Sequence, residues 1–142
     1  MKAILSAHIL VFKNSQVLLV RHEKGADHLT GVYGIPGGRI NENENFVNAA
    51  IRELKEETGL IVDKADLQEF PNNQYTADIK RKDGTTKKFT MAVYFSSKFK
   101  GGLRRSSETE PEWIKLSKLY KYNLLPNVKN AILNARQSLI KP

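Results

Sequence analysis

The sequence predicts one domain of the mixed α/β class, and three observations support this prediction. The chain has 142 residues, a length that suits a single domain. It is 40% hydrophobic and 27% charged, as ordinary globular proteins are. Short runs rich in Ile, Val and Leu, which are typical of strands, occur beside two segments with the apolar spacing of helices. Neither a repeat nor a linker interrupts the sequence, so we expect one domain over residues 1–142.

The first part of the chain is expected to form a hairpin followed by loops. Residues 2–12 and 16–21 are rich in branched apolar residues and predict two strands joined by a tight turn. Residues 22–31 are polar and contain two glycines, so we expect a loop. A short extended segment then leads into Pro36-Gly37-Gly38, a bend at which the main chain can come close to another group.

Residues 46–58 form the clearest helix of the sequence. An apolar stripe runs along it at helical spacing, made of Val47, Ala50, Ile51 and Leu54. One of the asparagines at 41, 43 and 45 is expected to cap its start. Gly59 stands where a left-handed residue would end it.

The second half is expected to contain further strands and a final helix. The strands are predicted at residues 60–62, 67–70, 74–79 and 88–99. A Lys-Asp-Gly-Thr turn at residues 82–85 suits a hairpin between the last two. Residues 104–112 are polar and predict a loop, and residues 126–139 predict a helix with Pro126 in its first turn.

Composition limits the partners and the compartment. The net charge of +8 favours an anionic partner but does not select its class, and a lysine-rich solubilising surface is the alternative. The densest basic stretch, residues 80–88, flanks a hairpin turn, so we do not expect a nucleic-acid site there. The chain contains no cysteine, which excludes disulfides, thiolate metal sites and cysteine nucleophiles. No apolar run approaches the roughly 20 residues of a membrane span, and residues 1–9 are too interrupted for a signal peptide. We therefore expect a cytoplasmic protein without a membrane partner.

Three glutamates on the predicted helix point to metal chemistry. Glu53, Glu56 and Glu57 are three and four residues apart, a spacing that places side chains together on one helical face. Three neighbouring carboxylates repel one another unless a cation lies between them. Mg²⁺ takes carboxylate oxygen ligands and usually acts together with substrate phosphates. The pattern therefore predicts metal-assisted chemistry on a phosphate compound.

The segment from Gly38 to Leu60 resembles a complete Nudix box, the signature of hydrolases that act on nucleoside diphosphates linked to another group. The seven fixed residues of the box are Gly38, Glu44, Arg52, Glu53, Glu56, Glu57 and Gly59. Its two apolar positions are filled by Leu54 and Leu60. A chance match has odds of roughly one in 10⁸ per window. The resemblance implies an α/β/α sandwich with a central mixed β-sheet.

The resemblance also implies roles for individual residues. Glu53, Glu56 and Glu57 would bind Mg²⁺, with Mn²⁺ as a plausible substitute, and a carbonyl of the bend at Gly38 could join them. Arg52 would pair with a box carboxylate, for which Glu44 is the preferred candidate, and hold the metal-binding face in position. The reaction implied is hydrolysis of a pyrophosphate linkage by an activated water.

The general base is left open, because related enzymes use either a box glutamate or a glutamate on a downstream loop. Glu108 and Glu110 lie in the corresponding part of this chain, and Glu110 is the preferred of the two. Arg21, Arg39 and Gly37 are candidates for contacts with substrate phosphates. His8 and His28 are expected to be structural or exposed.

The sequence does not select the nucleotide. Tyr75 lies near the position of a tyrosine in relatives that cleave dinucleoside polyphosphates, whereas the proline typical of ADP-ribose hydrolases is displaced here to Pro71. By elimination we expect hydrolysis of a (deoxy)nucleoside triphosphate to monophosphate and pyrophosphate. The alternatives are an ADP-ribose, nucleotide-sugar or dinucleoside polyphosphate hydrolase, a domain that senses nucleotides without cleaving them, and a protein that binds or processes RNA ends. Relatives occur as monomers and as homodimers.

Overall fold

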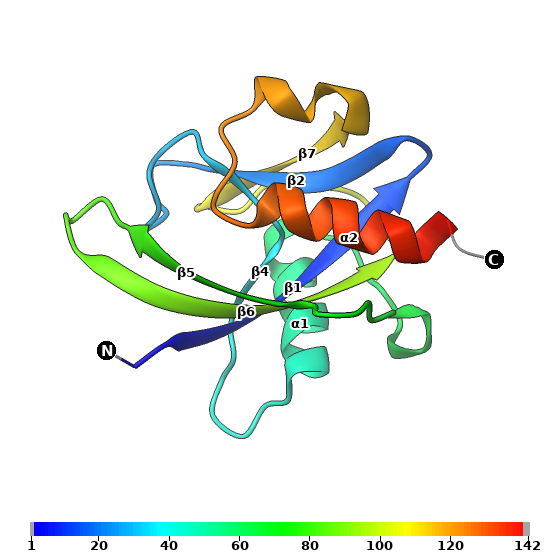
Figure 1. The fold of residues 1–142 in the computed structure, drawn as a ribbon, viewed down its shortest axis with the longest axis horizontal. Helices are drawn as coiled ribbons and strands as arrows, with labels where there is room; N and C mark the ends of the chain where they lie inside the picture. Colours follow the sequence, from blue (N-terminus) through cyan, green and yellow to red (C-terminus); the bar gives the residue numbers. More distant parts are fainter. Residues whose placement is uncertain (1, 141–142) are drawn as a thin grey trace.

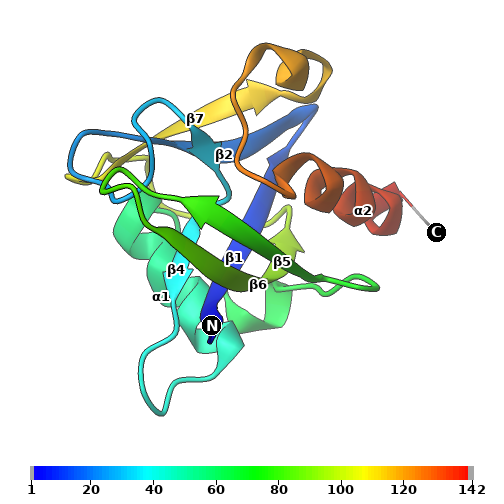
Figure 2. The same cartoon turned by 60° about the vertical axis from the view of Figure 1, so that its left-hand side comes forward.

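Seven strands form one mixed sheet, and a helix packs against each of its faces (Figures 1 and 2). This computed structural model describes residues 2–140. The strands are β1 (Ile4–Lys13), β2 (Gln16–His22), β3 (Tyr33–Gly34), β4 (Gly37–Arg39), β5 (Gln74–Lys80), β6 (Thr86–Ser96) and β7 (Thr109–Lys115). The helices are α1 (Phe46–Thr58) and α2 (Val128–Ile140), with short 3₁₀ turns at Lys64–Asp66 and Leu116–Lys121. The α/β class and the mixed sheet predicted from the sequence are confirmed.

Strand β1 joins two halves of the sheet. It runs parallel to β6 and beside it from Ile4 to Val11, and β5 pairs with the far side of β6. Its pairing with β2 is confined to the hairpin end, where Phe12 lies opposite Val17. The short strand β4 takes the place of β2 beside the first half of β1, while β2 continues against β3 and β7. The two halves therefore separate beyond the hairpin.

The core has two parts because side chains alternate along β1. Ala7, Ile9 and Val11 point toward α1 and pack with Ala50 and Leu54. Leu10 and Phe12 point to the opposite face and pack with the apolar stripe of α2, which consists of Val128, Ala131, Ile132 and Ala135. Burial on both faces anchors β1 and fixes α1 beside β4, which is the position that the functional groups require.

Helix α1 spans the predicted residues, and its ends are those that the sequence indicates. Asn45 is the capping asparagine, since its side chain accepts a hydrogen bond from the Asn48 N–H at 2.8 Å. Gly59 ends the helix with φ of 83°, and its N–H donates to the Lys55 carbonyl. The predictions for the start and the end of this helix are confirmed.

Several predicted boundaries were wrong. Residues 60–62 and 67–70 make single bridges, from Ile61 to Lys100 and from Gln68 to Phe95, because each segment is too short to build a ladder. The strand predicted at 88–99 begins earlier and ends at Ser96, whose hydroxyl bonds to Lys98 and turns the chain. The final helix begins at Val128, two residues after Pro126.

Strand β7 was predicted as the end of a loop. Its acidic sequence and Pro111 lack the apolar alternation of a strand. It nevertheless pairs with β2 over seven positions, from Gln16–Lys115 to His22–Thr109. Proline is tolerated there because β7 is an edge strand, which needs hydrogen bonds on only one side. No helix within residues 2–140 is long and apolar enough to span a membrane.

Candidate active site

A cleft of about 480 Å³ lies where the two halves of the sheet separate. Its volume is within the range of small-molecule sites. Residues of α1 and β4 line one part of it, and Ser6 and His8 of β1 line another. The loop before β7, the loop after β2, the β5–β6 hairpin, β3 and the segment that leads into α2 supply further walls. The cleft thus gathers residues from almost the whole length of the chain.

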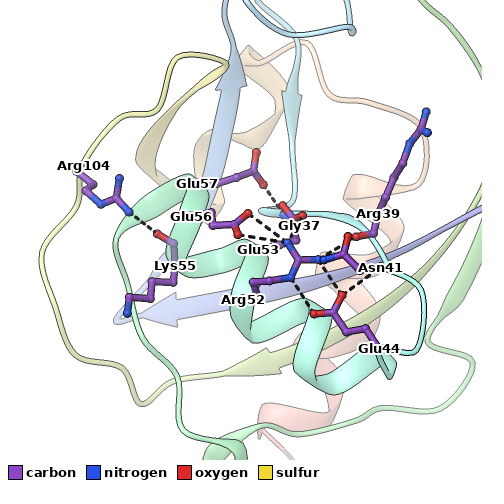
Figure 3. A network of polar contacts seen from close by, with 10 residues as sticks. All are labelled: Gly37, Arg39, Asn41, Glu44, Arg52, Glu53, Lys55, Glu56, Glu57 and Arg104. Carbon is purple, nitrogen blue, oxygen red and sulfur yellow. Dashed lines mark hydrogen bonds and ion pairs between the residues drawn. The ribbon is translucent and has the colours of Figure 1, made fainter.

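Arg52 is the centre of a carboxylate network on α1 (Figure 3). Its Nε and Nη2 donate to the two oxygens of Glu44 at 2.8 and 2.9 Å, a bidentate arrangement. Its Nη1 donates to Glu53 at 2.8 Å and to Glu56 at 3.2 Å. Hydrogen bonds from Arg52, followed by one from the Asn41 N–H, lower the pKa of Glu44 to about 2. The pairing of Arg52 with Glu44 that the sequence suggested is therefore present.

Glu57 lies on the other side of this network and turns toward β4 (Figure 3). It accepts a hydrogen bond from the Gly37 N–H at 2.6 Å. Burial raises the pKa of Glu57 to about 8, against the opposing effect of the Gly37 hydrogen bond, and the charge of Glu53 adds to the rise. Burial also raises the pKa of Glu53, despite its contact with Arg52. Negative charge is thus disfavoured at both carboxyl groups.

The two glycines of β4 allow the main chain to lie against these groups. A Cβ on Gly38 would stand 2.5 Å from the Glu53 carboxylate. A Cβ on Gly37 would stand 2.3 Å from the Ala7 carbonyl oxygen and would collide with the His8 ring. A side chain at Gly37 would collide with main chain, and one at Gly38 would displace the Glu53 carboxylate, so the bend and the carboxylates form one packed unit.

The donor set suits a hard divalent cation. Carboxylates and main-chain carbonyls are the ligands that Mg²⁺ prefers, and a cation would relieve the electrostatic cost that raises the pKa of Glu53 and Glu57. The three carboxylates do not converge on one point, because Glu53 and Glu56 are bound to Arg52 and Glu57 to Gly37. Within the part of the chain that the structure describes, no three His, Asp or Glu side chains are arranged as ligands of one metal.

The two candidate loop glutamates have different surroundings. Glu108 lines the cleft, beside Ser106 and Thr109, and its charge is one of the effects that raise the pKa of Glu57. Glu110 is bound to Arg21, with 2.6 Å between Oε2 and Nη2, and does not line the cleft. Of the two glutamates, Glu108 is therefore the one that lies in the cleft.

Other residues suggested by the sequence also fall into two groups. Gly37 and Arg39 line the cleft, and the Arg39 carbonyl accepts from Arg52. Arg21 lies outside it, bound to Glu23, Glu110 and Glu112, because alternation along β2 turns it away from the face of His22. Tyr75 also lies outside, where its hydroxyl accepts from Asn134 of α2.

All three histidines of the chain line the cleft, and two of them, His8 and His28, are those expected to be structural or exposed. His8 contacts the Ile35 carbonyl through Nδ1 and the Ser6 hydroxyl through Nε2. Burial lowers the pKa of His8 and of His28 to about 4, and it lowers the pKa of His22 as well. Ser6 and His8 could have been recognised as polar residues at alternate positions of an apolar strand. His28, Arg81 and Phe89 carry no such local signal.

Comparison with known proteins agrees with this architecture. A model of the NUDIX domain family matches residues 2–135. The MutT protein of Methanosarcina mazei Go1 has a similar fold, with a TM-score of 0.78 at 22% identity over 98% of this chain and 96% of that one.

Two curated relatives show different extents of similarity. Nudix hydrolase 8 of Arabidopsis thaliana is 36% identical over 58 residues, which are 41% of this chain and 16% of that protein. The oxidized purine nucleoside triphosphate hydrolase of Danio rerio is 28% identical over 111 residues, 78% of this chain and 65% of that protein. The chain spans between about a sixth and a third of the length of the first four Arabidopsis relatives that it matches.

Proposed function

The chain belongs to the Nudix family, and from this premise we propose that it is a metal-dependent hydrolase that cleaves the pyrophosphate bond of a nucleotide. The observation that carries the proposal is the packing of Glu53 and Glu57 against the glycine bend of β4 at the wall of a nucleotide-sized cleft. Two carboxyl groups with raised pKa values, held together by glycines, fit a site built for a cation and phosphate.

Glu53, Glu56 and Glu57 would hold the metal, together with a main-chain carbonyl at Gly38. Mg²⁺ suits these oxygen donors, and Mn²⁺ is the alternative. A bound divalent cation would neutralise charge on the phosphate oxygens and lower the pKa of a water molecule that it binds.

The protein's own residues would position and activate the reactants. Arg52 would keep Glu44, Glu53 and Glu56 in register on α1, as its hydrogen bonds already do. Arg39 would face the phosphates from β4. Glu108 is the best-placed base, because it lines the cleft and no ion pair occupies it within the described residues.

In the proposed step, a water oxygen forms a bond to phosphorus while the bridging P–O bond breaks. Glu108 receives the proton of the attacking water and later releases it to solvent. A nucleoside triphosphate and water thus become a monophosphate and pyrophosphate.

A (deoxy)nucleoside triphosphate is the substrate class that we favour. The Danio rerio relative, whose name refers to oxidized purine nucleoside triphosphates, is matched over most of this chain. The excess of basic residues suits a polyanion. ADP-ribose, nucleotide sugars and dinucleoside polyphosphates are the alternatives. We also propose a cytoplasmic location, with a monomeric or homodimeric state.

A hydrolysis panel tests the proposal. Purified protein with Mg²⁺ is given ordinary and oxidised nucleoside triphosphates, ADP-ribose, nucleotide sugars and dinucleoside polyphosphates, and the products are separated by chromatography. We expect monophosphate and pyrophosphate from triphosphates, and loss of turnover in Glu56→Gln and Glu57→Gln.

The matched control is Glu42→Gln, an exposed glutamate of the preceding loop, which should keep full activity. A folded protein that binds nucleotides with micromolar affinity but hydrolyses none would instead indicate a sensing domain. Activity that survives in both Glu56→Gln and Glu57→Gln would refute the assignment of the site.

A further inference from the structure

Beyond the glutamates, the cleft continues as an apolar slot on the face of the sheet that α2 covers farther along. Phe89 and Met91 of β6 and Ile79 of β5 line this part. Leu125 and Pro126, from the segment that leads into α2, line it as well. These side chains do not contribute to the proposed chemistry at phosphorus, so the slot is available for another part of the substrate.

The slot has an aromatic lining, in which the His28 and Phe89 rings are tilted by 51° to each other. The rings of Phe89 and His28 are 5.8 Å apart between centroids, and the Arg81 guanidinium carbon lies 5.7 Å from the Phe89 ring centre. Aromatic rings and guanidinium planes are the surfaces on which nucleobases stack, whatever their sequence. The shape therefore suits a nucleobase rather than a second phosphate.

Arg81 adds a directional element to this slot. Its side chain is only 14% exposed, and Nη2 donates to Asp27 at 2.9 Å. The Lys82 N–H also donates to the Asp27 carbonyl, which ties the loop after β2 to the hairpin. Asp27 is 79% exposed, so this ion pair adds little stability but fixes the direction of the guanidinium.

The Nε of Arg81 is buried and has no hydrogen-bond partner among the described residues. The Nδ1 of His28, in the same slot, is likewise buried without a partner. Buried donors are rarely left unsatisfied in native proteins, and those that are call for a ligand or an ordered water. Each of these two atoms is enclosed by protein, with less than 1 Å² exposed, so a base in the slot would be reached by the terminal N–H groups of Arg81 instead.

We propose that Arg81 determines base specificity, by donating through the terminal N–H groups of its guanidinium to the carbonyl oxygen of a keto base that lies against Phe89. The inference rests on the proposed nucleotide hydrolase and names its substrate class: guanine, hypoxanthine, uracil or thymine nucleotides. Adenine and cytosine carry an amino group at the corresponding position. There, N–H would face N–H and both donors would be left unpaired, which is the situation that sites reject most strongly.

Two pairs of substrates isolate this contact. ITP and ATP carry an oxygen and an amino group at the same ring position, and so do UTP and CTP. We expect kcat/KM to favour the keto member by about tenfold or more in the natural protein. Arg81→Met keeps the aliphatic stem and should bring both ratios to within about threefold of unity. Arg81→Lys keeps the charge but loses the planar guanidinium with its fixed N–H groups, and should lower both ratios too.

Lys80→Met is the control, because Lys80 is an exposed basic residue on the same hairpin outside the cleft. It should keep the ratios of the natural protein. Equal loss of activity toward all four triphosphates in Arg81→Met would show a phosphate contact and overturn the proposal, as would ratios near unity in the natural protein. If Arg81→Met does not fold, Arg81→Lys carries the same test.

Binding of IMP and AMP, measured by calorimetry in metal-free buffer, gives a readout that does not depend on turnover. Tighter binding of IMP that is lost in Arg81→Met supports the assignment even if no triphosphate is hydrolysed. Absence of hydrolysis together with this preference for IMP would refute the proposed catalysis and leave the proposed base specificity intact. Equal binding of IMP and AMP by the natural protein would overturn the specificity alone.

Discussion

Glu108 and Glu110 are only two residues apart, but the start of strand β7 between them gives their side chains different surroundings. Glu110 belongs to β7, where the register places it opposite Arg21 of β2 and the two side chains form an ion pair. Glu108 precedes the strand, in a turn that Ser106 holds by accepting hydrogen bonds from the Glu108 and Thr109 N–H groups. That turn is what keeps Glu108 at the wall of the cleft.

Glu108→Gln should therefore abolish most activity, whereas Glu110→Gln should not. A general base contributes about 10²–10⁴-fold to rate, so we expect kcat to fall at least a hundredfold in Glu108→Gln. Glu110→Gln weakens one partly exposed ion pair, which is worth about 1 kcal/mol or less of stability. Steady-state kinetics beside thermal unfolding separates the two effects. A large loss of kcat in Glu110→Gln alone would reverse the assignment.

The contiguous part of the site could be predicted from the sequence, and the distant part could not. Glu44 and Arg52 lie eight residues apart, and the helix that brings them together is itself evident from the local pattern. The surroundings of Arg21 depend instead on pairing between β2 and β7, which are about ninety residues apart in the chain. His28 and Arg81 both lie beside Phe89, and the contact between the loop and the hairpin that carry them leaves no periodic signal in the sequence.

At the scale of elements, the end of α1 is the point where the site is joined to the rest of the fold. The loop that follows β6 closes on this end: the Arg104 N–H donates to the Thr58 carbonyl, and the Arg104 side chain donates to the Lys55 carbonyl. Gly59 lies under that loop in a left-handed conformation. The position of the glutamates thus depends on a helix end that two loop contacts hold.

Gly59→Ala should destabilise the protein more than Gly84→Ala. Both glycines have nearly the same positive φ, 83° and 85°, so placing alanine in this conformation costs about 1 kcal/mol at each position. A Cβ at Gly59 would lie 2.4 Å from the Gly102 carbonyl oxygen, whereas nothing lies within 4 Å of one at Gly84. We expect losses of about 2–4 kcal/mol and about 1 kcal/mol in the free energy of unfolding. Urea titrations measure both.

Equal losses in the two variants would mean that the Gly102 loop moves aside without cost. In that case kcat should also be unaffected in Gly59→Ala. A larger stability loss accompanied by lower activity supports the view that the loop fixes α1 in its working position.

The elements that the sequence predicted well are those whose signals are local. Helix α1 has an apolar stripe, a capping asparagine and a terminal glycine, and all three agree. Strand β7 has none of these signals, because its stability comes from β2 and from its position at the edge. Strand β4 was predicted as a bend for the same reason. Its Gly-Gly-Arg sequence has no strand propensity, and its pairing with β1 is imposed by the fold.

At the scale of the whole molecule, burial in the cleft disfavours the charged form of all three histidines. Burial is the largest effect and lowers the pKa of each. A backbone hydrogen bond opposes this effect at His8 and His22, whereas neighbouring charge adds to it at His28. His22 and His28 are also in contact, with 4.8 Å between ring centroids, so protonation of one disfavours the other. A protonated histidine in this region would repel the Arg81 guanidinium, which lines the same cleft.

Stability should therefore fall as the pH is lowered from about 6.5 to about 4. The folded-state pKa of His8 and of His28 is about 4, below the unfolded value of 6.5, so the unfolded chain binds more protons in this window. Their contribution is present in full above pH 6.5 and is lost as the pH falls through the window. Together the two histidines should change the free energy of unfolding by at most about 2 kcal/mol per pH unit, after allowance for their partial exposure. Glu57, whose raised pKa acts in the opposite direction, offsets part of the slope.

Urea titrations of the metal-free protein between pH 4 and pH 8 measure this slope, and variants assign it to the histidines. His28→Gln and His8→Gln should each flatten the acid side, because each removes a group that gains a proton on unfolding. Both variants retain Glu57, so its contribution cancels in the comparison with the natural protein. An unchanged acid slope in the double variant would show that carboxylates, and not the neutral histidines of the cleft, set the acid limit of the fold.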